Sequence, residues 1–262
     1  MVWDGIETVR ARSPIVMNIT NYVVMNNTAN ALLAIGASPV MAHALDEVEE
    51  LVGISSALVL NIGTLSGPWI EAMLLAGNAA RSRGVPVVLD PVGAGASAFR
   101  TSTARRLVET VRPAIIRGNA SEIRAVLRAV GGTHGVDSSA SVDEVADDAQ
   151  ELARSAACVV SVSGQVDLIT DGTRVDRISN GSPLMPRVTG MGCTATAVTG
   201  AFAGAGLAPL EAATLAMATM GVAGDIAGER ARGPGSFQME FLDALHGLSS
   251  ADVAARLRMQ RI

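Results

Sequence analysis

The chain has 262 residues, a length that suits one α/β domain with a large central sheet, and 49% of these residues are hydrophobic. Its net charge of −5 is modest and its charges are scattered, which argues against a nucleic-acid-binding protein, because such proteins carry clustered Lys and Arg. All 20 basic residues are arginines, so a phosphate-binding P-loop lysine, a Schiff-base lysine and a lysine general base are excluded.

Two features bear on compartment and membrane contact. Cys158 and Cys193 are too few and too far apart for a disulfide scaffold, and neither has metal-ligand partners nearby in the sequence. The first residues include acids and lack the apolar core of a signal peptide. The long apolar stretch 208–227 contains Glu211 and Asp225 and is broken by glycines, which predicts a buried helix rather than a membrane span. We therefore expect a cytoplasmic protein that contacts no membrane.

Short apolar, β-branched runs alternate with helical patterns along the first 161 residues. Strands are expected at residues 15–19, 39–41, 57–61, 85–90, 114–117 and 158–161. Helices are expected between them, at residues 24–35, 68–83, 97–110, 121–130 and 142–155. This alternation predicts a mainly parallel sheet with right-handed crossovers and helices on both faces. No linker, charge block or repeat divides the chain, so residues 1–262 are expected to form one domain.

The pattern changes in the last hundred residues. Runs at 167–170 and 174–178 flank Asp171-Gly172, a dipeptide typical of tight hairpins, which predicts an antiparallel edge of the sheet. Beyond Pro186 the chain is expected to be wholly helical, with helices at 193–205, 210–231, 237–245 and 251–258. Ligands in open α/β sheets bind beyond the carboxyl ends of the strands. We therefore expect ligand-binding and catalytic side chains just after the strand ends at Met41, Asn61, Asp90, Arg117 and Ser161.

Residues 188–206 (VTGMGCTATAVTGAFAGAG) place Gly190 and Gly192 directly before a helix of small residues. The free N–H groups of the first turn and the helix dipole form an anion site. Because glycine has no Cβ atom, a phosphate can approach this backbone closely. Cys193 falls at the start of this helix, where the same field is expected to lower the pKa of its thiol. The spacing alone leaves open a simple glycine turn with an inert Cys193.

Two strand ends offer ligands for Mg²⁺ and phosphate. Asp90 leads into a glycine loop, where its carboxylate is placed to hold Mg²⁺ directly or through water, and it lies too far upstream to cap the next helix. Arg117 can pair bidentately with phosphate oxygens, as a lysine-free nucleotide site requires. Glu122 is either an outer-sphere Mg²⁺ partner or part of a helix cap formed with Asn119 or Ser121.

Residues 18–44 are rich in asparagine before and along an apolar helix. Side chains such as Asn21 and Met41 at the mouth of a pocket suit a small polar heterocycle, although the asparagines could instead only cap and turn the chain. The hydroxyl of Ser163, just past a buried strand, could touch nucleotide phosphate or ribose, or simply make a turn. The histidines have no catalytic partner in the sequence and are not assigned a catalytic role: His43, His134 and His246.

Six segments, in this order, resemble the hydroxyethylthiazole kinase family of the ribokinase-like superfamily. They are NITNYVVMNNTANALLAIGASPVM, LVLNIGTL, VVLDPVGAGAS, IIRGNASEI, VVSVSGQVDLITDG and VTGMGC. The resemblance implies a three-layer ribokinase-like fold and transfer of the ATP γ-phosphoryl group to the primary alcohol of 4-methyl-5-(2-hydroxyethyl)thiazole. It also implies dependence on Mg²⁺ and a homotrimer with active sites at the subunit interfaces.

The resemblance assigns roles residue by residue. Seven positions match functional positions of the family: Cys193 (catalytic), Met41 and Gly190 (thiazole), Arg117 and Ser163 (ATP), and Asp90 and Glu122 (Mg²⁺). We add Asn21 as a substrate-binding candidate and Gly192 as an ATP-binding candidate. Ser163 stands where the family often has threonine, so the hydroxyl is kept, and Met191 stands where threonine is frequent between the two glycines.

Several alternatives remain at this point. Many ribokinase-like kinases carry aspartate at the position of Cys193, so the sequence leaves open whether the thiol deprotonates the alcohol or orients it. A hydroxymethylpyrimidine kinase or a hydrated-nicotinamide repair dehydratase is disfavoured by this cysteine and by the asparagine-rich segment. A non-catalytic protein that binds thiazole or nucleotide is disfavoured by the intact Asp90, Arg117, Glu122 and Cys193. A Rossmann dehydrogenase is disfavoured because the glycine motif lies late in the chain.

Overall fold

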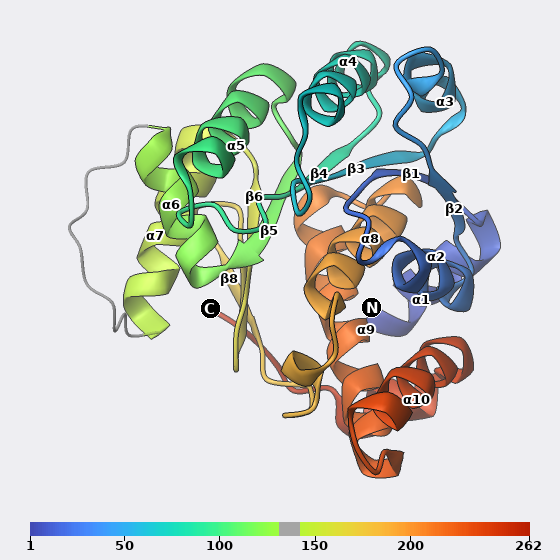
Figure 1. Ribbon diagram of the computed structural model, residues 1–262. Coiled ribbons are helices and arrows are strands. Elements are labelled where there is room, and N and C mark those ends of the chain that lie inside the picture. Colours follow the sequence, from blue (N-terminus) through green and yellow to red (C-terminus); the bar gives the residue numbers. More distant parts are fainter. Residues whose placement is uncertain (131–141) are drawn as a thin grey trace.

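The computed structural model describes residues 1–130 and 142–262. These residues form a nine-stranded sheet in the order β2-β1-β3-β4-β5-β6-β7-β8-β9, with helices on both faces (Figure 1). Strands β1 to β6 are mutually parallel, whereas β7, β8 and β9 each run antiparallel to the preceding strand in the sheet. The three-layer ribokinase-like fold expected from the sequence, with its antiparallel edge, is confirmed.

The strands are β1 (Ile15–Ile19), β2 (Ser38–Met41), β3 (Ala57–Asn61), β4 (Val87–Asp90), β5 (Ile115–Asn119), β6 (Val159–Ser163), β7 (Asp167–Thr170), β8 (Val175–Ile178) and β9 (Met259–Arg261). The helices are α1 (Val2–Arg12), α2 (Met25–Ile35), α3 (Val48–Ile54), α4 (Gly67–Arg83), α5 (Ala98–Val111), α6 (Ala120–Ala129), α7 (Val142–Ala156), α8 (Met191–Gly204), α9 (Pro209–Arg230), α10 (Pro234–Gly247) and α11 (Ser250–Arg256). A 3₁₀ turn, Met185–Arg187, precedes α8.

Alternating strand residues pack into two hydrophobic cores, one on each face of the sheet. Val16, Val59 and Val88 belong to the core beneath α8 and α9, whereas Met17 and Leu89 belong to the core beneath α3 to α7. Figure 1 shows α3 to α7 along one side of the sheet and α1, α2, α8, α9 and α10 on the other. This period of two follows from the pleat, and it decides which polar strand residues face α8.

Helix α9 is long and largely buried. It is long and apolar enough to cross a membrane by length and composition, yet 83% of its apolar window is buried inside the protein. It packs against α8, α10 and strands β5 to β8. A helix that is apolar all round belongs in a core, as the sequence predicted for residues 208–227.

Three elements were not expected from the sequence: α1, α3 and β9. Helix α1 buries Val2, Ile6 and Val9 against α8 and α9; this i, i+4, i+7 spacing is helical and could have predicted the helix. Strand β9 shows that the expectation of a wholly helical segment after Pro186 was wrong, because Met259–Arg261 pairs with β8. A three-residue strand has no pattern of its own and exists only through this pairing. Strands β5 and β6 also run two residues beyond their expected ends.

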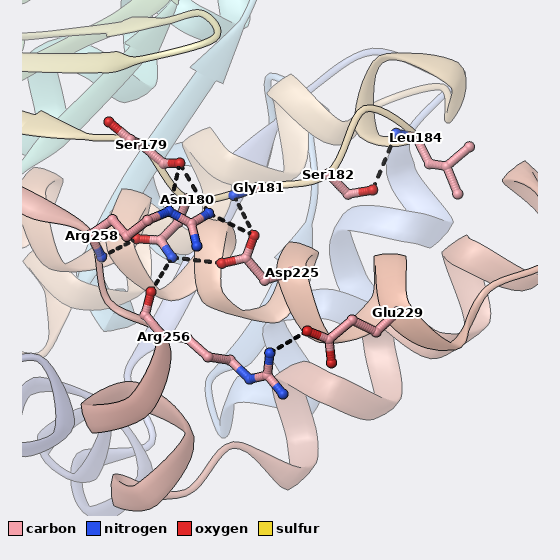
Figure 2. Close-up of polar contacts among 9 residues, drawn as sticks. All are labelled: Ser179, Asn180, Gly181, Ser182, Leu184, Asp225, Glu229, Arg256 and Arg258. Carbon is pink, nitrogen blue, oxygen red and sulfur yellow. Dashed lines mark hydrogen bonds and ion pairs between the residues drawn. The ribbon is translucent and has the colours of Figure 1, made fainter.

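The segment after β8 packs tightly on α9. A Cβ atom at Gly221 would lie 2.6 Å from the Cβ of Asn180, so only glycine allows this approach. Asp225 accepts hydrogen bonds from Asn180 Nδ2, from the Gly181 N–H and from Arg258 (Figure 2). These contacts fasten the C-terminal segment to α9.

A cavity of about 340 Å³ lies beside these contacts. Its charged lining is paired within the protein, since Arg258 contacts Asp225 and Arg256 contacts Glu229 (Figure 2). We therefore assign this cluster a structural role.

Candidate active site

The carboxyl ends of the parallel strands bring buried polar side chains to one edge of the sheet. Asn61, Asp90, Arg117 and Ser161 each lie two residues after a strand residue of the core beneath α8, so they share the face that α8 covers. Asn61 is 1% exposed, Asp90 2% and Arg117 5%. Polar groups that are buried this deeply require partners: Asn61 and Asp90 bind each other, whereas Arg117 Nε and Ser161 Oγ have no hydrogen-bond partner among the described residues.

Asp90 lies at the centre of this cluster. Its Oδ2 accepts hydrogen bonds of 2.8 Å from Asn61 Nδ2 and of 2.8 Å from Thr196 Oγ1 on α8. Burial raises the pKa of Asp90 to about 6, because desolvation outweighs the opposing positive charge of Arg117 and the two hydrogen bonds. Ser97 caps α5 instead, so Asp90 has no capping role there, as the sequence predicted.

Cys193 lies in the first turn of α8, where Asn21 Nδ2 approaches its Sγ to 3.5 Å. Burial, with the negative charge of Asp90, raises the pKa of the Cys193 thiol to about 11. The expectation of a lowered thiol pKa was therefore wrong, because desolvation and a neighbouring carboxylate outweigh the field of the helix N-terminus. At neutral pH the sulfur carries its proton, which suits an orienting group better than a base.

Arg117 lies against the first turn of α8. A Cβ atom at Gly192 would stand 3.0 Å from Nη1 of Arg117, so glycine lets the helix backbone approach the guanidinium. Arg117 Nε is buried and has no hydrogen-bond partner among the described residues. Gly190, in the left-handed region at φ 84°, begins the helix and, as a glycine, offers no side-chain cap. Free backbone N–H groups and an unpartnered guanidinium nitrogen thus lie side by side, as an anion site requires.

Glu122 performs the structural role that the sequence left open. Asn119 and Glu122 form a capping box at the start of α6, in which Glu122 Oε2 accepts the Asn119 N–H at 2.8 Å. Its Oε1 accepts the Gly93 N–H at 2.8 Å and so ties α6 to the loop that follows Asp90. The carboxylate adds negative charge near Asp90 while both of its oxygens bind backbone.

The remaining candidates lie along the same edge. Ser163 ends β6, next to the strand of Arg117, and its Oγ lies 3.4 Å from Gly118 O. Met41 ends the outer strand β2, beside β1, which separates it from the strand of Asn61. The structure thus joins Asn21, Asp90, Arg117, Gly192 and Cys193 by contacts or charge, and it places Ser163 and Met41 on either side of them.

Sequence reasoning missed several residues of this site. Asn61 was used only to mark a strand end, although it contacts Asp90 and Asn21. Thr196 lies three residues after Cys193 on α8, a spacing that could have drawn attention to it. Asp167, whose pKa burial raises to about 6, accepts the Gly164 N–H beside Ser163.

Of the histidines, His43 stacks on Trp69 at 3.7 Å between ring centroids. His246 lies in the last turn of α10, and His134 lies outside the described residues.

The profile of the hydroxyethylthiazole kinase family matches residues 6–251. A hydroxyethylthiazole kinase of Nitratidesulfovibrio vulgaris is 59% identical over 260 residues, which cover 99% of this chain and 97% of that protein. The chain belongs to the hydroxyethylthiazole kinase family. A second member, from Oleidesulfovibrio alaskensis, is 57% identical over 260 residues and covers 99% and 98% of the two chains.

Solved structures support the same family and fold. The hydroxyethylthiazole kinase protein of Pyrococcus horikoshii superposes with a TM-score of 0.94 at 41% identity, covering 100% of this chain and 98% of that one. A pyridoxal kinase of Staphylococcus aureus, solved with AMP-PCP and pyridoxal, has a TM-score of 0.62 at 14% identity over 95% and 98% of the chains. At that identity the likeness shows the fold alone, which is the fold this hydroxyethylthiazole kinase family member shares.

The carboxylates at the site of this family member bear on whether it fits Mg²⁺. Among the described residues, no group of three or more His, Cys, Asp or Glu side chains gathers as a metal cage. Mg²⁺ in kinases, however, takes one or two carboxylates and completes its shell with water and phosphate oxygens. Of the two carboxylates that the sequence suggests for Mg²⁺, Glu122 has both oxygens engaged by backbone N–H groups. Both hydrogen bonds to Asp90 from described residues reach Oδ2, which leaves Oδ1 for a cation.

Proposed function

We propose that this chain transfers the γ-phosphoryl group of ATP to the primary alcohol of 4-methyl-5-(2-hydroxyethyl)thiazole, which yields the thiazole phosphate used in thiamine biosynthesis. Membership of the hydroxyethylthiazole kinase family supports the activity. At the site, the observation that most supports this activity is that the first turn of α8 lies against the buried guanidinium of Arg117, whose Nε has no partner among the described residues. That pair suits a phosphoryl group in transfer.

In this mechanism the protein positions the reactants and neutralises charge, because phosphoryl transfer passes through a loose transition state. Arg117, the backbone at Gly192 and the hydroxyl of Ser163 hold the phosphates of ATP. Asp90 and Glu122 would hold Mg²⁺ beside these phosphates, with both Glu122 oxygens already accepting backbone N–H groups. When bound, Mg²⁺ supplies positive charge that offsets the charge of the phosphate oxygens.

The acceptor alcohol lies beside Cys193 in the proposed complex. Met41 and Gly190 contact the thiazole, as their family positions suggest. Asn21 was expected to contact the substrate, but its Nδ2 donates to Asn61 and Cys193 and its Oδ1 accepts the Val23 N–H. We therefore assign Asn21 to holding the thiol rather than to binding substrate.

The activity is tested by ADP release from Mg²⁺ and ATP in the presence of the thiazole alcohol, with hydroxymethylpyrimidine and a sugar alcohol as parallel acceptors. We expect the thiazole to be turned over faster than either by a wide margin. Equal rates with thiazole and pyrimidine would contradict the assignment. Thiazole binding without ADP release would favour a non-catalytic binding protein.

Cys193→Ala is expected to lower kcat by less than the roughly 10²–10⁴-fold typical of general-base removal. The reason is that a thiol with a pKa raised to about 11 is protonated at neutral pH and orients the alcohol. Cys193→Asp should retain substantial activity, since it supplies the carboxylate common elsewhere in the superfamily. Steady-state kcat and KM of both variants measure this, with the buried Cys158→Ala as control. A 10³-fold loss in Cys193→Ala would instead make the thiol an obligatory base.

We also propose a homotrimer with active sites at subunit interfaces, formed by a single kinase domain of residues 1–262 and located in the cytoplasm. Exposed apolar side chains in the first 54 residues support a contact surface: Tyr22 (66% exposed), Val23 (64%), Leu33 (59%) and Ile54 (60%). Three chains of 26.8 kDa should scatter light as a particle of about 80 kDa. A fully active particle the size of one chain would contradict the trimer.

A further inference from the structure

We propose that Asn61 is a positioning residue for this reaction, which fixes the carboxylate of Asp90 on one side and, through Asn21, the thiol of Cys193 on the other. The inference rests on the kinase activity proposed above. It concerns a residue that makes no contact with substrate in the proposed complex and acts through its neighbours.

The orientation of the Asn61 amide is set by its surroundings. Its Oδ1 accepts the Gly63 backbone N–H at 3.0 Å and Asn21 Nδ2 at 2.8 Å. Because a backbone N–H can only donate, the amide oxygen must face Gly63, and the NH₂ group must then face Asp90. Asn61 Nδ2 accordingly donates to Asp90 Oδ2 at 2.8 Å. With 1% of its surface exposed, the side chain has no solvent to turn toward.

On the Asp90 side, two donors meet at one oxygen. Asn61 Nδ2 comes from the end of β3 and Thr196 Oγ1 from α8, and both reach Oδ2 at 2.8 Å. Donors from two directions fix the plane of the carboxylate and direct Oδ1 away from them. Asn61 thereby determines which oxygen of Asp90 is left for the cation and the phosphates.

On the Cys193 side, Asn61 fixes the direction of a second amide. Asn21 Oδ1 accepts the Val23 N–H at 3.1 Å, and one hydrogen on Asn21 Nδ2 goes to Asn61 Oδ1. The other hydrogen is then directed to Cys193 Sγ at 3.5 Å. Thr196, three residues after Cys193 on α8, donates a hydrogen bond to Asp90, so the helix that carries the thiol also contacts the carboxylate. Neutral side chains, two amides and one hydroxyl, thus fix the positions of the Cys193 thiol and the Asp90 carboxylate relative to each other.

The decisive variant is Asn61→Asp, which keeps the size of the side chain and the acceptor for Asn21 and Gly63. It replaces the donor that faces Asp90 by a carboxylate oxygen. We expect kcat to fall about 10–100-fold, as for other residues that orient metal or catalytic ligands, with the Mg²⁺ concentration for half-maximal rate raised and KM for the thiazole changed less than about threefold. Asn78→Asp, the same change at an exposed site on α4, is the matched control.

A second readout needs no turnover. The rate at which iodoacetamide alkylates Cys193, followed by mass spectrometry at one pH, should change at least threefold in Asn61→Asp. Cys158 is the internal negative control, since burial raises the pKa of Cys158 to about 12 and its alkylation should stay slow in both proteins. If Asn61→Asp does not fold, Asn61→Ser serves, because one hydroxyl cannot replace both ends of the amide.

A folded Asn61→Asp enzyme with wild-type kcat, Mg²⁺ requirement and Cys193 alkylation rate would overturn the proposal. Failure of the wild-type protein to phosphorylate the thiazole would overturn the proposed function instead. In that case the alkylation rates still test the positioning of Cys193 by Asn61.

Discussion

Replacing Asp90 by asparagine is expected to lower kcat by about 10²–10³-fold, the loss typical when one charge-stabilising group of an active site is removed. Asparagine keeps an oxygen that can accept from Asn61 and Thr196, so the packing around residue 90 is retained. It removes the negative charge that holds Mg²⁺ in the proposed mechanism. The Mg²⁺ dependence of the residual rate should weaken, while thiazole binding stays nearly intact.

The same change is expected to stabilise the ligand-free protein above pH 6. The pKa of Asp90 is about 6 in the folded protein and 3.8 in the reference state, so ionising the buried group at neutral pH costs roughly 3 kcal/mol. A raised folded pKa favours the native state below about pH 4, and this advantage is lost as the pH rises through 6. Asp90→Asn is free of that loss and should melt several degrees higher at pH 7.5, with a smaller difference at pH 5.

Thermal melts at the two pH values, without nucleotide or Mg²⁺, together with kcat, check this prediction. Asp167→Asn is a comparison for stability alone, because burial raises the pKa of Asp167 to about 6 as well and this residue lies beside Ser163. It should gain stability in the same pH range. A destabilised Asp90→Asn whose folded fraction has normal activity would show that Asp90 is structural.

Arg117→Ala is expected to lower kcat/KM for ATP by about 10²–10³-fold, because it removes the guanidinium that faces the first turn of α8. Arg117→Lys should recover only part of this loss, since an ammonium lacks the planar fork that pairs with two phosphate oxygens. Exposed Arg105 on α5, which pairs with Glu109, provides the control Arg105→Ala.

The pH profile gives Arg117→Ala a second signature. The positive charge of Arg117 lowers the pKa of both Asp90 and Asp167 against the effect of burial. Without it both pKa values rise, so the acidic limb of the kcat/KM profile should move to higher pH. An Arg117→Ala variant with an unshifted limb and near wild-type ATP turnover would remove this residue from the nucleotide site.

The sequence predicted the fold well wherever a segment carries its own pattern. Strands β1 and β3 were predicted with their exact bounds because a short, unbroken apolar run indicates a buried strand by its length and its β-branched residues. Strand β9 was missed because it depends on a partner far along the chain, through the pairing of Met259 with Ile178. The local propensity of a segment does not indicate which distant strand it will pair with.

The site shows the same division. Asp90, Arg117 and Cys193 could be found because each stands where a strand or helix end meets glycine. The pKa of Cys193 could not be predicted, since its sign depends on burial and on Asp90, which lies on a different element. For Glu122 the sequence allowed a helix cap, which the structure contains, and a role near Mg²⁺, which stays a proposal.

The two ends of the sheet bear on how copies of this chain can meet. At one edge, β2 has four residues, and Pro39 lacks the N–H that a docking strand would need. At the other, β9 has three residues and carries Arg261, which is tied back to Asp176. Short edges with proline or charge are poor templates for a further strand. Growth of the sheet from molecule to molecule, the first step toward fibrils, is thereby discouraged, and copies that associate must do so through side chains.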